Sequence, residues 1–138
     1  MEGNASLLRR LGPLAPAVLG LVLITHSSTA SAADCYANEC NGRDPKEMHC
    51  DADAITAGLP VSTGNVTIEL RWSKACGANW ARISPAPKDW KFRVENKQGH
   101  HWDETVDYES PSWFGKMVNG LGVDSRACFM NNVCTNWN

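Results

Sequence analysis

The sequence lacks an excess of basic over acidic residues, which argues against partners that are recognised by positive charge. There are 13 Lys and Arg residues against 15 Asp and Glu residues, for a formal net charge of −2. Because nucleic-acid-binding domains rely on clustered positive charge, we expect no nucleic-acid partner. A composition of 43% hydrophobic and 20% charged residues is also unlike that of a disordered tail. The length of 138 residues instead indicates one folded domain.

The sequence also lacks the short motifs that mark several enzyme and metal-binding classes. It has no G-x-S-x-G elbow, no glycine-rich phosphate loop, no H-E-x-x-H motif and no C-x2-C pair. No local signature supports a Ser-His-Asp triad. We therefore expect no cofactor and no metal. No apolar run reaches the roughly 20 residues that a membrane-spanning helix needs.

Residues 1–32 have the pattern of a secretory signal peptide. Arg9 and Arg10 precede an apolar run of about fourteen residues, which glycine and proline interrupt. Ala30-Ser31-Ala32 then matches the small-residue pattern that signal peptidase accepts. We therefore exclude this segment from the fold. Residues 33–138 are expected to form a single secreted, extracellular domain with no membrane contact after cleavage.

All six cysteines and all six tryptophans lie in residues 33–138. An even number of cysteines in a small exported domain indicates disulfides rather than metal ligands or a cysteine nucleophile. Six cysteines allow fifteen pairings, and spacing alone does not select one. We prefer the pairs Cys35–Cys40, Cys50–Cys76 and Cys128–Cys134, and the main alternative joins Cys35 or Cys40 to Cys128 or Cys134.

Alternation of apolar and polar residues predicts a β-rich chain. It is clearest over residues 66–72, as in a strand with one buried face. Residues 90–95 and 102–108 alternate on either side of a turn at 96–99, which predicts a hairpin. Residues 113–118 are a fourth candidate strand.

Two short helices are expected beside these strands. Asp44-Pro45-Lys46-Glu47 has the pattern of a capping box with proline at the first helical position. Ser73 is placed to cap a helical turn in which Cys76 and Trp80 share a face. The glycines and proline over residues 58–64 mark loops. The expected fold is therefore mostly β: a small antiparallel β domain with one or two short helices, stapled by disulfides.

The run His100-His101-Trp102-Asp103-Glu104 offers the most chemistry. Adjacent side chains on a strand point to opposite faces, so the two histidines would not hold one metal ion. His101 and Asp103 would share a face and could act as acid and base, with Glu104 as a further candidate. The alternative is an exposed polar turn with no catalytic role.

The tryptophans are the other candidates for function. Trp72, Trp80 and Trp90 lie in phase with apolar neighbours, so we expect them in the core. The binding candidates are Trp102, Trp113 and Trp137. Exposed indoles can stack on sugar rings or anchor a protein partner. The alternative is that these three also build the core of a small domain.

Two stretches are specific enough to compare with known families. The first contains Cys40-Asn41-Gly42-Arg43-Asp44-Pro45, Met48, Cys50 and Asp53-Ala54-Ile55-Thr56, and the second Ile68-Glu69-Leu70-Arg71-Trp72-Ser73, Cys76 and Trp80-Ala81-Arg82-Ile83. The chain thereby resembles the DUF2690 (YjfA-like) family of small secreted bacterial proteins of unknown function. The likeness covers residues 35–83 well and 88–138 more loosely, and Trp72 stands where tyrosine is commoner. The resemblance implies a secreted, disulfide-containing domain, but no catalytic residue or ligand.

These observations favour a secreted, non-enzymatic binding or structural domain. Its expected partner is extracellular, either a carbohydrate such as cell wall or another protein, and we expect a monomer. One alternative is a small secreted hydrolase that uses His101 with Asp103 or Glu104. Another is an inhibitor or toxin-like module that presents a disulfide-closed loop to a second protein.

Overall fold

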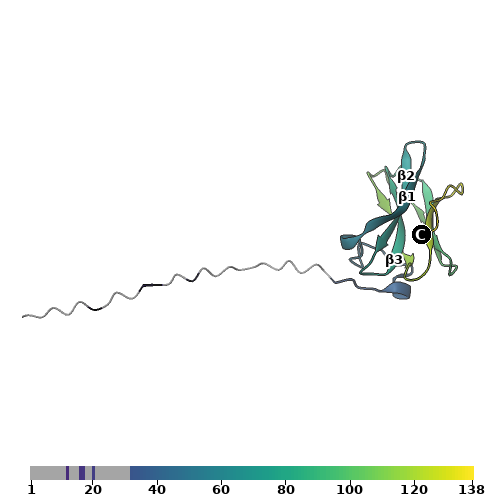
Figure 1. Cartoon of the computed structure of the whole chain (residues 1–138). Coiled ribbons are helices and arrows are strands. Elements are labelled where there is room, and N and C mark those ends of the chain that lie inside the picture. Colours follow the sequence, from purple (N-terminus) through teal and green to yellow (C-terminus); the bar gives the residue numbers. More distant parts are fainter. Residues whose placement is uncertain (1–11, 13–15, 18–19, 21–31) are drawn as a thin grey trace, which may run out of the picture.

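The computed structural model describes residues 12, 16–17, 20 and 32–138. Apart from these few positions, the expected signal peptide lies outside the described residues. Among the described residues, no helix is long and apolar enough to cross a membrane. This part of the chain forms two short 3-10 helices and eight strands (Figure 1): η1 (Ala37–Cys40), η2 (Asp51–Asp53), β1 (Ile55–Thr63), β2 (Val66–Ser73), β3 (Ala78–Ser84), β4 (Lys91–Asn96), β5 (His101–Thr105), β6 (Trp113–Phe114), β7 (Val118–Asn119) and β8 (Ser125–Phe129).

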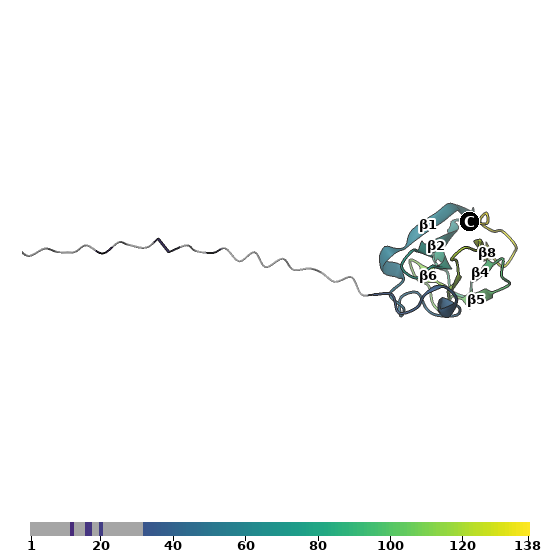
Figure 2. The ribbon, with the colours of Figure 1, turned by 60° about the horizontal axis from the view of Figure 1, so that its bottom comes forward.

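The strands form two antiparallel sheets. The first has the order β1-β2-β3-β6, with β7 also paired to β3, and the second has the order β5-β4-β8. Strands β2 and β3 contact β8, and β3 also contacts β4. Figure 2 shows β1, β2 and β6 on one side of the domain and β4, β5 and β8 on the other. The predicted mostly β, antiparallel fold is confirmed.

The main core lies between the sheets and follows from the alternation in the sequence. Val66, Ile68 and Leu70 of β2 are fully buried, and Phe92 and Val94 of β4 belong to the same apolar cluster. Burying a side chain of this size contributes roughly 1.5–3 kcal/mol. This core therefore confirms the two strands that the alternation predicts most clearly.

The hairpin is also confirmed, because β4 pairs with β5 across the predicted turn, although β5 ends at Thr105 and does not continue to residue 108. The segment 113–118 differs from the prediction of one strand. It forms two separate strands, β6 and β7, which pair with different parts of β3. Gly115 lies between them and is buried against the Phe92 ring, at a point where an added Cβ would come within 3.2 Å of that ring.

Two strands occur where the sequence pattern predicts none. β1 contains Gly58 and Pro60, which we expected to mark loops, and its register with β2 shifts between Ala57 and Val61. β1 lies at the edge of its sheet, where a bulge and a proline that cannot donate a hydrogen bond are tolerated. β8 pairs with β4 and so depends on a partner distant in sequence.

The helix predicted after Asp44 is wrong, although its cap is present. The Asp44 carboxylate accepts hydrogen bonds from the backbone N–H groups of Lys46 (2.8 Å) and Glu47 (3.1 Å). The segment nevertheless makes only turns. His49 adopts a φ of 55°, in the left-handed region that ends a helix.

The helical turn predicted to carry Cys76 and Trp80 is also wrong. The Ser73 hydroxyl does cap the turn, since it accepts a hydrogen bond from the backbone N–H of Cys76 at 3.1 Å. Trp80, however, lies on strand β3. There it is fully buried, as predicted for a core tryptophan. The two short helices that form, η1 and η2, lie elsewhere in the N-terminal segment.

The disulfides join Cys35 to Cys40, Cys50 to Cys76 and Cys128 to Cys134, which is the preferred pairing. The first four cysteines form a second buried cluster with Ala78, Trp80 and Met117. Trp80 and its neighbour Ala81 point to opposite faces of β3, and Ala81 belongs to the main core between the sheets. The cluster around Trp80 therefore covers the outer face of the first sheet.

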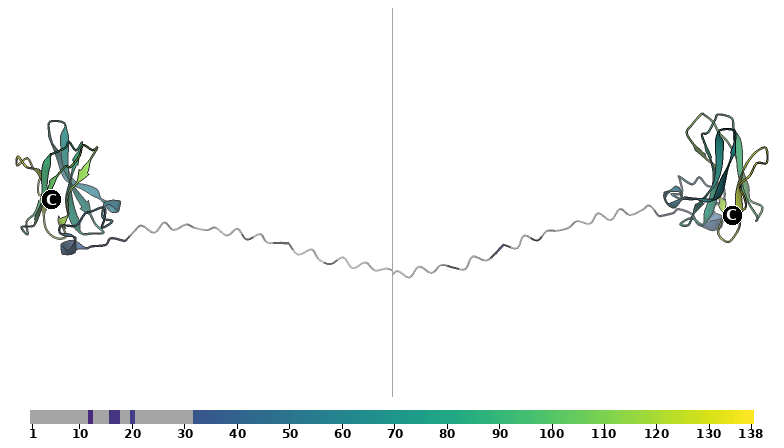
Figure 3. Two further views of the ribbon diagram at one scale, coloured as in Figure 1. Left: turned by 180° about the vertical axis from the view of Figure 1, so that it is seen from behind. Right: turned by 45° about the horizontal axis from the view of Figure 1, so that its top comes forward.

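The C-terminal end returns to the second sheet. Asn138 and Ser125 exchange two backbone hydrogen bonds, of 2.9 and 3.0 Å. The end of the chain consequently lies beside the sheets in both views of Figure 3. The Cys128–Cys134 disulfide closes the loop that makes this return.

Candidate functional site

A pocket of about 390 Å³ lies where the edge strands of the two sheets, β5 and β6, approach each other. Glu104 of β5 lies opposite the buried Phe92, and Trp113 of β6 lies opposite the buried Ile83. Directly opposed residues share a face of a sheet, so Glu104 and Trp113 both point inward from these edges. The residues of this Trp113 pocket are Asp44, Lys46, Glu104, Tyr108, Ser110, Ser112, Trp113, Phe114 and Lys116.

An aromatic pair and a carboxyl group form one wall of the Trp113 pocket. The rings of Tyr108 and Trp113 meet edge to face, with 4.9 Å between their centroids. The Trp113 indole N–H donates a long hydrogen bond of 3.5 Å to Glu104 Oε1. Tyr108 is 64% exposed, whereas Trp113 and Glu104 are half-buried. The pocket therefore presents one accessible ring beside a positioned indole and carboxyl group.

The electrostatics of Glu104 differ from those of an ordinary surface glutamate. Burial raises the pKa of its carboxyl group, and the negative charges of Asp107 and Asp44 act in the same direction. The Trp113 hydrogen bond and the Lys116 charge oppose the rise without cancelling it. Glu104 is therefore more readily protonated than a free glutamate, and its protonated form can donate as well as accept a hydrogen bond.

The N-terminal turn contributes Asp44 and Lys46 to the lining of the pocket. The Lys46 ammonium group lies over the Phe114 ring, 4.8 Å from its centroid. Phe114 packs in turn against the buried Trp80, with 6.2 Å between centroids. Asp44 uses one carboxylate oxygen, Oδ1, to cap its own turn. This part of the lining is consequently tied to the disulfide-containing cluster behind it.

The three catalytic candidates on β5 do not form one constellation. His101 and Asp103 share one face of β5, as predicted. This is the outer face, where they lie opposite Glu95 and Arg93, whereas Glu104 points inward. Asp103 accepts two hydrogen bonds from the Arg93 guanidinium, and this contact lowers the pKa of the carboxyl group. Asp103 thus has the surroundings of an ion-pair partner, and Glu104 belongs to a different site.

The three binding tryptophans also lie in different surroundings. Trp102 is 41% exposed, and its ring packs so closely on Gly42 that an added Cβ there would come within 2.5 Å of it. Trp137 is 37% exposed and lies under the Arg126 guanidinium, 4.5 Å from the ring centroid. Of the three, Trp113 alone lines the Trp113 pocket. They do not form a single flat platform.

A second pocket, of about 480 Å³, opens at one end of the sandwich. Trp72 lines it, together with Asn79, Gly120 and residues at the start of β1. The expectation that Trp72 belongs to the core is therefore wrong, because Trp72 is half-buried, belongs to neither buried cluster and lies with its ring against Gly120 at this pocket. Trp90 remains half-buried against the core, where its ring meets Phe129 edge to face at 5.8 Å.

Sequence reasoning did not select Tyr108, Lys46 or Phe114 for this site. The alternation of side chains on β5 places Glu104 on the face opposite to His101 and Asp103. The sequence alone could therefore have separated Glu104 from these two residues. The pairing of β6 with β3 brings Trp113 to the same edge, and no local pattern predicts it. Among the described residues, one group has the spacing for a metal ion, and its four cysteines are paired as disulfides.

Residues 38–128 match the family model described as "Protein of unknown function (DUF2690)". The chain belongs to this family. The DUF2690 match contains every residue of the Trp113 pocket, but it leaves out Cys35 and Cys134. No curated protein and no solved structure matches the chain.

Proposed function

We propose that this protein is a secreted, non-enzymatic binding domain that recognises a carbohydrate through the Trp113 pocket. The observation that carries the proposal is the Tyr108–Trp113 pair beside the half-buried Glu104 carboxyl group. Aromatic rings can stack on the apolar face of a sugar ring, and carboxyl and ammonium groups exchange hydrogen bonds with sugar hydroxyls. The pocket volume, about 390 Å³, lies in the usual range for small-ligand sites.

The disulfides support the location of this function. Three disulfides in a small domain are typical of extracellular proteins, because the cytosol keeps thiols reduced. Secretion is part of the proposal and agrees with the signal-peptide pattern of residues 1–32. An extracellular polysaccharide, such as that of a cell wall, is the corresponding ligand class.

A hydrolase remains the second candidate, because one observation favours it. A carboxyl group whose pKa is raised by burial is suited to act as a general acid, and Glu104 has this property within reach of the Asp44 and Asp107 charges. In this alternative Glu104 would protonate the leaving group of the substrate. His101 and Asp103, on the outer face, would take no part.

The proposal is tested by retention of the oxidised protein on insoluble polysaccharides and isolated cell walls. Trp113→Ala should abolish retention, and Tyr108→Ala should weaken it about tenfold, since a ring contact contributes up to about 1.5 kcal/mol. Trp137→Ala is the matched control, because its surroundings share no residue with the pocket. We expect it to bind like the unmodified protein. No retention on any polysaccharide, or equal loss in all three variants, would contradict the proposal.

The same samples separate binding from hydrolysis. We expect the retained polysaccharide to release no soluble sugar, and Glu104→Gln to remain bound within about tenfold, because the amide keeps the hydrogen-bonding shape of the neutral carboxyl group. Sugar release by the unmodified protein that Glu104→Gln abolishes would instead support the hydrolase.

A further inference from the structure

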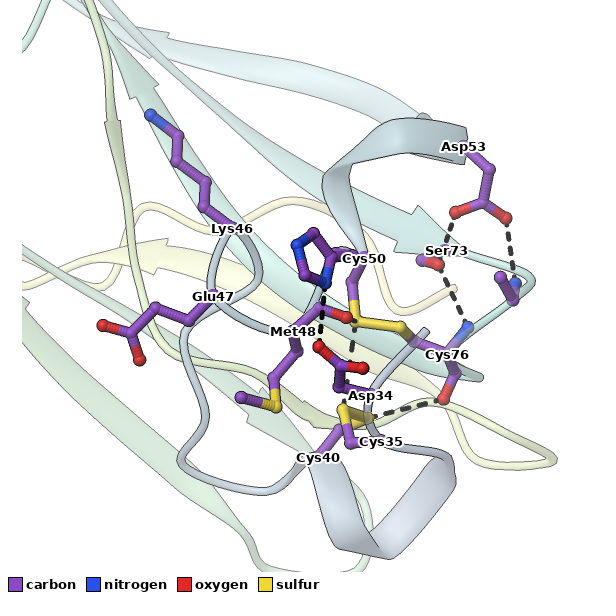
Figure 4. Close-up of a disulfide and its surroundings, with 12 residues drawn as sticks. Asp34, Cys35, Cys40, Lys46, Glu47, Met48, Cys50, Asp53, Ser73 and Cys76 are labelled. Atoms are coloured by element: carbon purple, nitrogen blue, oxygen red, sulfur yellow. Dashed lines mark hydrogen bonds and ion pairs between the residues drawn. A yellow bond between two sulfur atoms is a disulfide. The ribbon is translucent and has the colours of Figure 1, made fainter. Parts of the chain in front are cut away.

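Four cysteines from three separate segments converge at one point of the fold. Cys35 lies just before η1, and Cys40 is the last residue of η1. Cys50 precedes η2, and Cys76 lies in the turn between β2 and β3. All four Sγ atoms lie within 4.8 Å of one another. Between the two disulfides, Cys35 Sγ and Cys50 Sγ are 3.9 Å apart (Figure 4).

Contacts that involve no sulfur hold these segments together. The backbone N–H of Ala37 donates to the Cys76 carbonyl at 2.7 Å, and that of Asp34 donates to the Met48 carbonyl at 3.0 Å. The Asp53 carboxylate accepts hydrogen bonds from the Ser73 hydroxyl and from the Ala75 N–H, the latter at 2.9 Å (Figure 4). Opening the two disulfides would therefore leave the four cysteines close together.

This arrangement suits a tetrahedral metal ion. Zinc bound by four thiolates has Zn–S distances of about 2.3 Å, which places the sulfurs about 3.8 Å apart. The two sulfurs of each opened disulfide would move apart from the bonded distance of about 2 Å. The sulfurs of different pairs already lie within 4.8 Å of one another, and Cys35 Sγ and Cys50 Sγ are 3.9 Å apart, close to the required spacing. Cys40, Cys50 and Cys76 are fully buried and Cys35 is 6% exposed, which would protect the ion from solvent.

We propose that the reduced chain binds one Zn²⁺ ion through Cys35, Cys40, Cys50 and Cys76, so that a metal replaces two disulfides at the same point. Two equivalents of a phosphine and two of water reduce the two disulfides to four thiols: each phosphine gives up two electrons and takes the oxygen of one water as a phosphine oxide, and the two hydrogens of that water go to the thiols. The four thiols then lose their protons as their sulfurs bind the metal. The proposal concerns the reduced chain and does not depend on carbohydrate binding.

The experiment uses Co²⁺ as a spectroscopic probe after reduction by a phosphine without oxygen. We expect one Co²⁺ per chain, with a thiolate-to-cobalt charge-transfer band and the intense visible absorption of tetrahedral cobalt. Added Zn²⁺ should displace the cobalt and abolish both signals. The double variant Cys128→Ser with Cys134→Ser is the matched control and should bind like the unmodified chain, because that pair lies apart from the cluster.

The double variant Cys35→Ser with Cys40→Ser keeps the Cys50–Cys76 disulfide for folding before reduction. After reduction it should lose stoichiometric Co²⁺ binding, because two of the four ligands are gone. Circular dichroism should show that Zn²⁺ stabilises or restores the fold of the reduced unmodified chain. Absence of the charge-transfer band, whether that chain is folded or unfolded, would overturn the proposal. So would an undiminished band in the Cys35→Ser, Cys40→Ser variant.

Discussion

Glu69 shows how single side chains organise the outer face of the first sheet. Its carboxylate accepts hydrogen bonds from the Thr56 hydroxyl and the Arg82 guanidinium, both at 2.7 Å, and Arg71 donates to Thr56 at 2.7 Å. Burial alone would raise the pKa of Glu69, but the hydrogen bonds and the two arginine charges outweigh it and lower the pKa. The folded state therefore favours the ionised carboxylate.

Glu69→Gln should lower the free energy of unfolding by about 1–3 kcal/mol at pH 7, because hydrogen bonds to a charged group are lost. Since the folded pKa is lowered, this contribution is present above the ordinary glutamate pKa of about 4.3 and is lost as the pH falls through the folded value. Denaturant unfolding at pH 7 and at acid pH measures the difference. Glu109→Gln, at an exposed position, is the control. A difference that does not shrink at acid pH would count against this account.

At the scale of elements, the N-terminal segment depends on specific polar contacts with the first sheet. Asp53 of η2 accepts hydrogen bonds from Ser73 and from the N–H of Ala75, and so joins η2 to the turn that carries Cys76. A 3-10 helix as short as η2 has little stability of its own. Its position therefore relies on this contact and on the Cys50–Cys76 disulfide.

Asp53→Ala should destabilise the protein by about 1–2 kcal/mol, since it removes both of these hydrogen bonds. Asp51→Ala is the matched control, because Asp51 is an exposed aspartate of the same helix and only its backbone carbonyl takes part in η2. It should change stability by less than about 0.5 kcal/mol. Thermal unfolding of the oxidised variants provides the comparison. Equal effects of the two substitutions would contradict the role of Asp53.

Sequence patterns predict correctly those strands in which apolar and polar residues alternate because one face is buried. β2 and β4 alternate along their length because one face of each meets the core. β5 has no fully buried residue and is held by its pairing with β4 across the predicted turn. β1 escapes prediction because Gly58 and Pro60 resemble loop residues, and only its edge position makes them tolerable. The helix expected at Trp80 fails for a related reason, since pairing with β2 overrides the local cap at Ser73.

At the scale of the whole molecule, the candidate site forms where the two sheets and the N-terminal segment meet. The Trp113 pocket takes Asp44 and Lys46 from the N-terminal turn, Glu104 from the second sheet and Trp113 from the first. Glu104 and Trp113 are only nine residues apart, but they belong to different sheets, and Asp44 and Lys46 come from a segment distant in sequence. Their meeting therefore depends on the tertiary fold. The sequence predicts Glu104 as a catalytic candidate and Trp113 as a binding candidate. It does not predict that the two side chains lie in one pocket.

The most direct test of carbohydrate recognition is to follow the indole N–H resonances of the six tryptophans by NMR. Soluble fragments of a polysaccharide that retains the protein are added, and Trp113→Phe assigns the decisive signal. We predict that the Trp113 indole resonance shifts with increasing oligosaccharide until it saturates, because its N–H lies in the Trp113 pocket beside Glu104. The Trp137 resonance should stay unchanged. A Trp113 signal that does not move, or saturable shifts confined to Trp72 or Trp137, would contradict the account.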